Sequence, residues 1–349
     1  MNKVIISTDI RTALTQEISE LPHDKLFILC DETTRRLCFP LVQSLPCFTG
    51  VEPITIPATD THKTLETLAH VWTELSTAGG TRHSLLVNLG GGMVTDLGGF
   101  AASTFKRGIP YINIPTTLLS MVDASVGGKT GINFNGLKNE IGVFNAPHAV
   151  ILDTEFLRTL DHPNILSGYA EMLKHGLISN EKNFAELLNF DLGNIDYHQL
   201  SSMVATSVAI KERIVQADPL EHGIRKALNL GHTAGHAFES FCLQSPTPVL
   251  HGYAVAWGLI CELYLSCTKA GFPTDRMRQT VQFIKENYGT LPITCDDYPL
   301  LYQLMTHDKK NTAGTINFTL LGNLGDIHIN QTATREEIYQ MLDFFREGL

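Results

Sequence analysis

The segment Ser84-Leu-Leu-Val-Asn-Leu-Gly-Gly-Gly-Met-Val-Thr-Asp-Leu-Gly-Gly-Phe100 predicts a buried strand, a tight turn and a helix in direct succession. The apolar run 84–89 is typical of a strand covered on both faces, and Gly90, Gly91 and Gly92 follow it. Glycine backbone can approach a ligand closely, and the helix N-terminus presents N–H groups to an anion. Glycines after a strand also form plain tight turns, and this spacing is not Gly-x-Gly-x-x-Gly. The segment therefore indicates an α/β unit whose turn is suited to bind phosphate.

Further apolar runs continue this alternation of strands and helices. Strands are predicted at residues 1–7, 25–30, 51–56, 111–114 and 149–152, and helices at residues 61–78 and 92–105. Near-continuous apolar strands separated by helices indicate a parallel sheet covered on both faces. Ligands of such sheets bind at the carboxyl ends of the strands.

After about residue 153 the pattern becomes helical. Helices are predicted at residues 166–177, 197–216, 226–243, 252–270 and 275–287, followed by a hairpin of residues 315–321 and 326–330 and a helix from Thr334. The sequence thus predicts an α/β N-terminal domain with a Rossmann-like parallel sheet, residues 1–154. A mainly α-helical C-terminal domain, residues 155–349, follows it.

Composition restricts the class of protein. The chain has 349 residues, 43% of them hydrophobic and 18% charged, which is typical of a folded globular protein. A net charge of −10 argues against nucleic acid or an anionic membrane as the partner. The seven cysteines contain no Cys-x-x-Cys pair, and residues 1–7 lack the apolar stretch of a signal peptide, so we expect a cytoplasmic protein with reduced thiols. The apolar segment 254–265 is interrupted by Glu262 and is too short to cross a bilayer.

Histidines and one glutamate indicate a metal site. His232 and His236 are four residues apart on a predicted helix, so both project from one face. Such a pair can bind a divalent metal, or its members can be hydrogen-bonded structural histidines. Glu171, on an otherwise apolar helix face, and His251, at a helix start, favour the metal. One carboxylate and two imidazoles with open coordination positions are typical of catalytic zinc.

Five basic residues have neighbours in the sequence that are unusual for charged residues on a solvent-exposed helix. Lys129, Lys138, Lys174, Lys211 and Arg225 are flanked by glycine, asparagine or apolar residues. Any single lysine can be a solvated surface charge. Several of them close to glycine turns favour an anionic ligand.

Three further residues have alternative roles. Arg107, after a helix end, can respond to the helix dipole or reach a ligand. Asp123 can cap a helix, orient a lysine or hold a substrate hydroxyl. Asp31 follows a strand and is suited to bind a ribose hydroxyl of NAD.

Eight ordered motifs resemble the 3-dehydroquinate synthase family over about residues 55–325. They are residues 90–100, Arg107-Gly108, 114–119, 122–131, Lys138-Asn139, 171–174, 229–236 and His251-Gly252. The resemblance implies conversion of 3-deoxy-D-arabino-heptulosonate 7-phosphate into 3-dehydroquinate and phosphate, in the shikimate pathway. It also implies tightly held NAD, a divalent metal (zinc or cobalt) and a homodimer.

The resemblance assigns roles to individual residues. The metal ligands it implies are Glu171, His232 and His251, which leaves His236 to handle protons beside the metal. The implied catalytic residues are Lys129, Lys174, His236, Asp123 and Glu221. The implied substrate contacts are Arg107, Lys138, Asn139, Lys211, Arg225, Asn229 and one lysine of the pair Lys309 and Lys310, of which Lys309 is preferred. The positions implied for NAD binding are Asp60, Lys63, Gly91, Gly92, Asp96, Thr116, Thr117, Phe156 and Thr159, alongside Asp31. The family has an acidic residue where this chain has Tyr253.

The implied reaction oxidises a secondary alcohol with NAD, eliminates phosphate, reduces the ketone again and closes the ring by an intramolecular aldol step. NAD is therefore used without net consumption. A metal-dependent NAD polyol dehydrogenase is one alternative, and it would release NADH. Another sugar-phosphate cyclase is a second alternative, differing at a few substrate contacts, and a non-catalytic nucleotide-binding protein is a third.

Overall fold

The computed structural model describes residues 3–243, 248–306 and 315–348. It divides into two compact units. The first unit is Met1–Asp161 with Asp196–Val208, and the second is His162–Ile195 with Ala209–Leu349. In the described part of the chain, no helix combines the length and the apolarity needed to cross a membrane.

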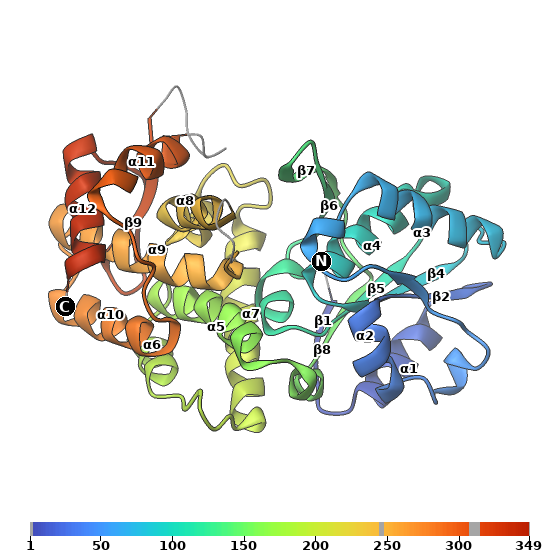
Figure 1. Ribbon diagram of the computed structural model, residues 1–349. Coiled ribbons are helices and arrows are strands. Elements are labelled where there is room, and N and C mark those ends of the chain that lie inside the picture. Colours follow the sequence, from blue (N-terminus) through green and yellow to red (C-terminus); the bar gives the residue numbers. More distant parts are fainter. Residues whose placement is uncertain (1–2, 244–247, 307–314, 349) are drawn as a thin grey trace. The chain divides into compact units, whose positions relative to one another are not determined.

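A six-stranded parallel sheet forms the centre of the first unit, with strand order β1-β8-β5-β4-β2-β3 (Figure 1). Its strands are β1 (Lys3–Ser7), β2 (Leu26–Asp31), β3 (Ile54–Ile56), β4 (Leu85–Gly90), β5 (Tyr111–Pro115) and β8 (Ala149–Asp153). Helices α1 (Ile10–Glu20), α2 (Glu32–Leu37), α3 (Leu65–Thr77) and α4 (Gly92–Thr104) pack against it or against one another. The predicted α/β fold class is confirmed.

Strand β4 and helix α4 approach each other unusually closely. A Cβ atom at Gly98 would lie 2.1 Å from Asn88 Oδ1, so only glycine fits there. Asn88 Nδ2 in turn donates a 2.9 Å hydrogen bond to Asn113 Oδ1 on β5. Gly98 of the helix and the asparagine of the apolar strand therefore belong to one contact, which fixes α4 over the sheet.

An antiparallel hairpin, β6 (Lys129–Phe134) and β7 (Leu137–Phe144), packs through β6 on α4. No strand was predicted for residues 129–144, so this hairpin was missed. Gly131 lies opposite Gly142 in the register. A Cβ atom at Gly142 would come within 1.9 Å of the Thr130 carbonyl oxygen, so the two strands depend on this glycine pair.

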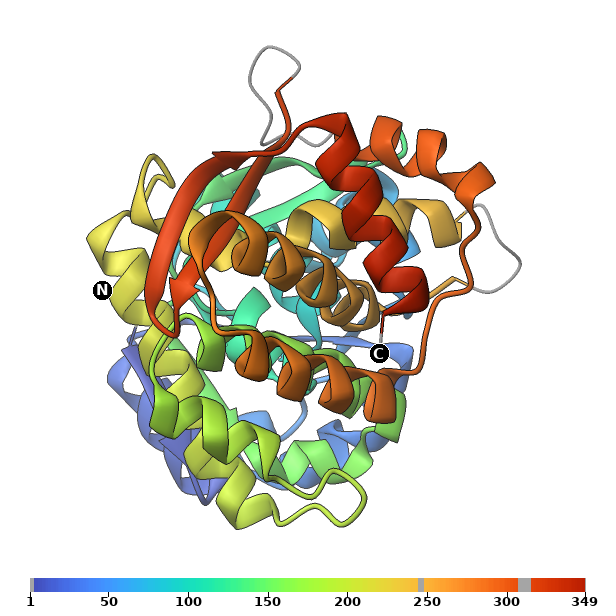
Figure 2. The same ribbon diagram turned by 90° about the vertical axis from the view of Figure 1, so that its left-hand side faces the viewer.

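The second unit is mainly helical, and α9 (His251–Leu265) packs against α5, α8, α10 and α12 (Figure 2). The bounds of the other elements are α5 (His162–Leu177), α6 (Glu181–Leu188), α7 (Tyr197–Ala217), α8 (His232–Leu243), α10 (Thr274–Tyr288), α11 (Tyr298–Thr306), α12 (Arg335–Glu347), β9 (Asn317–Asn323) and β10 (Asp326–Thr332). Residues 197–208 of α7 belong to the first unit. The predicted single helix over residues 226–243 is wrong, because a 3-10 turn, Ile224–Asn229, precedes α8 and Gly231 has φ of 78°.

Candidate functional site

Glycine residues allow three helices of the second unit to meet. A Cβ atom at Gly252 of α9 would lie 1.9 Å from the Ser167 carbonyl oxygen of α5. A Cβ atom at Gly258 would lie 2.0 Å from the Gly231 carbonyl oxygen, in the turn that precedes α8. Helix α9 therefore touches the backbone of both neighbours, and the side chains at the adjoining helix ends converge.

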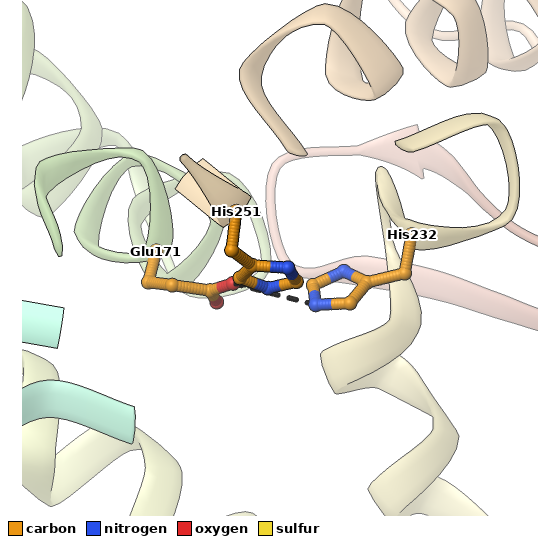
Figure 3. Close-up of side chains that lie close together, drawn as sticks. All are labelled: Glu171, His232 and His251. Atoms are coloured by element: carbon orange, nitrogen blue, oxygen red, sulfur yellow. Dashed lines mark ion pairs between the residues drawn. The ribbon is translucent and has the colours of Figure 1, made fainter. Parts of the chain in front are cut away.

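The converging side chains are Glu171 from α5, His232 from α8 and His251 from α9, as Figure 3 shows. Glu171 Oε1 lies 3.3 Å from His232 Nε2 and 3.5 Å from His251 Nε2. One potential ligand atom from each residue lies within 4.8 Å of the other two. Glu171 is 0% exposed, so its carboxylate is removed from water.

Both imidazoles are oriented through their second ring nitrogen. His232 Nδ1 lies 3.0 Å from the Leu230 carbonyl oxygen, and His251 Nδ1 lies 3.1 Å from Glu239 Oε2. A ring whose Nδ1–H donates to such an acceptor presents the Nε2 lone pair to a metal. Two Nε2 atoms and one carboxylate oxygen are donors that suit Zn²⁺ or Co²⁺ and leave coordination positions open. The residues present therefore fit the divalent metal that the sequence suggests.

A buried lysine sets the charge of this cluster. Lys174, one helical turn after Glu171 and 1% exposed, forms an ion pair with Glu171 Oε2. Burial alone would raise the pKa of Glu171, but the Lys174 ammonium and His232 hold that pKa well below its usual range. Burial alone would lower the pKa of His251, but the carboxylates of Glu171 and Glu239 raise it to about 10. A metal ion must therefore displace a proton from His251 to bind there.

The two histidines that helical spacing paired lie close together but belong to different clusters of potential metal ligands. The His236 ring centroid lies 5.4 Å from that of His232 and 6.0 Å from that of His251. His236 is not part of the cluster around Glu171 and instead groups with Glu239 and His251. This arrangement suits the predicted proton-handling role of His236, which stays a prediction.

Two other predicted residues of the second unit, Arg225 and Asn229, lie in the segment before α8. Arg225 is buried and its Nη1 donates a 2.6 Å hydrogen bond to the Pro219 carbonyl oxygen. Asn229 Nδ2 donates to Glu221 Oε1 at 3.3 Å. Lys211 on α7 is also buried. Lys309 lies outside the described residues.

In the first unit, the residues predicted to bind nucleotide phosphates meet at the carboxyl ends of β4 and β5. Gly91 is the N-cap of α4, which begins at Gly92. The Thr116 N–H donates to the Gly90 carbonyl oxygen at 3.0 Å, and a Cβ atom at Gly91 would lie 3.1 Å from Thr117 Cγ2. These residues form two adjacent turns next to a helix N-terminus, an arrangement that suits a phosphate.

An ion-pair triad lies in the same unit. Lys63 Nζ is 3.1 Å from Asp60 Oδ1 and 3.0 Å from Asp96 Oδ2. Burial alone would lower the pKa of Lys63, but Asp96 and Asp60 raise it, so the ammonium keeps its charge. Asn133 of β6 donates a 2.9 Å hydrogen bond to the Asp60 carbonyl oxygen and so ties the hairpin to this triad.

The remaining predicted residues of the first unit have varied surroundings. Asp31 Oδ1 accepts hydrogen bonds from the backbone of α2, so this carboxylate caps a helix in addition to any ribose contact. Phe156 is fully buried, and Thr159 Oγ1 donates to its carbonyl oxygen at 2.7 Å. Asp123 lies in a π-helical turn, Ser120–Ala124. Exposed positions on the hairpin are occupied by Lys129, Lys138 and Asn139.

Two glutamates that support the cluster were missed. Glu239 contacts His251, and the sequence signal for it was its position seven residues after His232 on the same helix. Glu262, noticed only as an interruption of an apolar helix, accepts backbone hydrogen bonds from Gly231 at 2.7 Å, Thr233 at 2.9 Å and Ala234 at 3.2 Å. A lone carboxylate in an apolar helix thus fixes the turn that presents His232.

The chain matches two family models and a relative of nearly the same length. Residues 53–167 match the 3-dehydroquinate synthase N-terminal family, and residues 168–311 match the 3-dehydroquinate synthase C-terminal family. The 3-dehydroquinate synthase of Parabacteroides distasonis is 57% identical over 346 residues, which covers 99% of this chain and 98% of that protein.

Two solved structures show the same fold. The 2-epi-5-epi-valiolone synthase of Streptomyces hygroscopicus subsp. jinggangensis 5008, with NAD+ and Zn²⁺ bound, has a TM-score of 0.86 and 25% identity, covering 99% of this chain and 97% of that one. A 2-deoxy-scyllo-inosose synthase complexed with carbaglucose-6-phosphate, NAD+ and Co²⁺ has a TM-score of 0.86 and 21% identity, covering 99% and 96%. The matches to both family halves and the 57% identity show that this chain belongs to the 3-dehydroquinate synthase family.

Proposed function

We propose that the protein converts 3-deoxy-D-arabino-heptulosonate 7-phosphate into 3-dehydroquinate and phosphate, as a phosphate-eliminating lyase of the shikimate pathway. The observation that carries the proposal is the convergence of Glu171, His232 and His251 beside the buried Lys174. This donor set suits a catalytic divalent metal, and membership of the family connects it with this reaction.

In this proposal a bound metal supplies Lewis acidity and a bound NAD supplies reversible oxidation. Glu171, His232 and His251 hold the metal. Lys174 keeps Glu171 ionised, and its positive charge stabilises the negative charge that develops on the substrate. His236, next to both imidazole ligands, takes up and returns a proton, assisted by Glu221.

Other residues bind the ligands in the proposed enzyme. Lys211, Arg225 and Asn229 contact the anionic substrate from the second unit, and Lys309 is a further predicted contact. From the first unit the proposed substrate contacts are Asp123, Lys129, Lys138 and Asn139. The proposed NAD contacts are Asp31, Asp60, Lys63, Gly91, Gly92, Asp96, Thr116, Thr117, Phe156 and Thr159.

The reaction can be distinguished from that of a polyol dehydrogenase by its balance of products. With the heptulosonate phosphate, we expect phosphate and carbocycle in equal amounts, no steady rise in NADH absorbance, and full turnover with NAD far below the substrate concentration. We expect this balance because NAD is regenerated within each turnover. A phosphate assay and absorbance at the NADH band measure both quantities. NADH formed stoichiometrically from glycerol, without phosphate release from the heptulosonate, would contradict the proposal.

We also infer a homodimer. Arg107, a further proposed substrate contact, lies in the 3-10 turn Phe105–Arg107 that follows α4, and it contacts the substrate of its own or of a neighbouring subunit. In the described residues β7 pairs only with β6, and it exposes Leu137, Ile141 and Phe144. An apolar strand with a free edge suits a second copy of the same chain.

Light scattering should therefore report about twice the chain mass of 38.5 kDa. Replacing Ile141 by lysine should lower the dimer fraction, because it places a charge on the apolar edge. A monomeric native protein at micromolar concentration would refute the inference. For its location we propose the cytoplasm, since none of the seven cysteines forms a disulfide, and cell fractionation tests this.

A further inference from the structure

Glu239 lies beside the metal cluster without being one of its proposed ligands. It is buried on α8, seven residues after His232, so one helix carries both residues two turns apart on the same face. Its Oε2 lies 3.1 Å from His251 Nδ1, while His251 Nε2 points toward Glu171. The two nitrogens of one imidazole thus contact two carboxylates from different helices.

We propose that Glu239 is a positioning residue, which fixes the tautomer and the ring orientation of His251 and so strengthens metal binding. The inference rests on the metal site in the proposed function. An imidazole can rotate and can carry its proton on either nitrogen, and a carboxylate on Nδ1–H removes that freedom. The same hydrogen bond increases the basicity of Nε2, which strengthens its bond to a metal.

Two features of the cluster assign this task to Glu239. Nδ1 of His232 contacts a backbone carbonyl oxygen, that of Leu230. Nδ1 of His251 contacts a side-chain carboxylate, that of Glu239. The residue after Gly252 is Tyr253, which has no carboxylate. The Tyr253 ring packs edge-on against Trp257 and Tyr288, with centroids 6.2 Å and 5.2 Å away. The carboxylate that holds His251 therefore comes from α8.

A second possible role follows from the same geometry. Glu239, His236 and His251 have ligand atoms within 4.8 Å of one another, so they could bind a cation themselves. That site would need His251 Nδ1 as a ligand, while the cluster around Glu171 needs Nε2 of the same ring. If Glu239 positions the ring, one metal ion binds Nε2 and Glu239 accepts the hydrogen bond from Nδ1. If Glu239 is itself a ligand, a second metal ion binds, so the number of metal ions per chain distinguishes the two roles.

The test compares Glu239→Ala and Glu239→Gln with Glu286→Ala, a control that removes an exposed carboxylate from α10 in the same unit. Zinc affinity of the metal-free protein is measured by competition with a chromophoric chelator, and the ligand field by the visible spectrum of the cobalt form. We expect Glu239→Ala to bind zinc about 10–100-fold more weakly, with an altered cobalt spectrum. Glu239→Gln, which retains an oxygen acceptor, should recover part of the affinity and the spectrum, and the control should match the wild type.

Unchanged zinc affinity and an unchanged cobalt spectrum in Glu239→Ala, with only a lower melting temperature, would overturn the inference. So would loss of one of two zinc ions per chain, since Glu239 would then be a ligand. A His251→Ala variant separates this inference from the proposed metal site. If that variant loses zinc while Glu239→Ala does not, only the positioning role fails, whereas normal zinc binding by both variants rejects the site itself.

Discussion

His251→Ala is expected to abolish zinc binding and to lower kcat/KM by at least about 1,000-fold. The variant leaves two proposed protein ligands, and a catalytic metal contributes several kcal/mol of transition-state stabilisation, with about 1.36 kcal/mol for each factor of ten. Chelation of the wild-type enzyme should produce the same loss, and zinc or cobalt should restore its activity. Metal content and steady-state kinetics measure these effects.

His328→Ala is the matched control for this prediction. His328 lies on β10 in the same unit, is half-buried, and contacts Asp326 at 3.2 Å instead of the metal cluster. It should retain metal and activity. Full activity of His251→Ala, or of wild-type protein shown to be free of metal, would refute the role of the cluster.

Lys174→Ala is expected to damage both catalysis and stability. Loss of one preorganised electrostatic contact should lower kcat/KM by the equivalent of about 2–4 kcal/mol. Because Lys174 is the cation paired with the fully buried Glu171, its removal should also lower the free energy of unfolding of the metal-free protein by about 3–5 kcal/mol. The effect on stability follows from the burial of this ion pair, which the sequence does not reveal.

Lys129→Ala provides the contrast. Lys129 is exposed on β6, so its replacement should lower kcat/KM by a similar amount without changing denaturant unfolding. Normal kinetics in both variants would show that neither lysine takes part in catalysis. Equal unfolding curves for Lys174→Ala and wild type would show that the ion pair does not stabilise the metal-free fold.

The sequence predicted the family, which the comparisons confirm, and the α/β class, because both depend on local patterns. The turn at Gly90 and the six apolar strands follow from residue type and period. The β6–β7 hairpin depends on the pairing of Gly131 with Gly142, which no local pattern reveals. The break at Gly231 was missed because residues on both sides have helical spacing, while the turn is held by Glu262 from a different helix.

The candidate site shows the same limit. Helical spacing brings His232 and His236 to one face, but it cannot show that Glu171 and His251 approach His232 from two other helices. The resemblance supplied that combination. Glu239 and the burial of Lys174 became apparent only when the helices were placed in space, because both depend on contacts or packing between helices.

The glycine contacts of α9 have a thermodynamic consequence for the metal. Gly252 and Gly258 hold this helix against backbone atoms of α5 and of the turn before α8, and these contacts do not involve rotatable side chains. Little conformational entropy is then lost when the ligands close on an ion, since the backbone that carries them is already fixed. A methyl group at either glycine would displace α9 from its neighbours. A substitution that changes the packing of the second unit there would therefore also change the distances between the metal ligands.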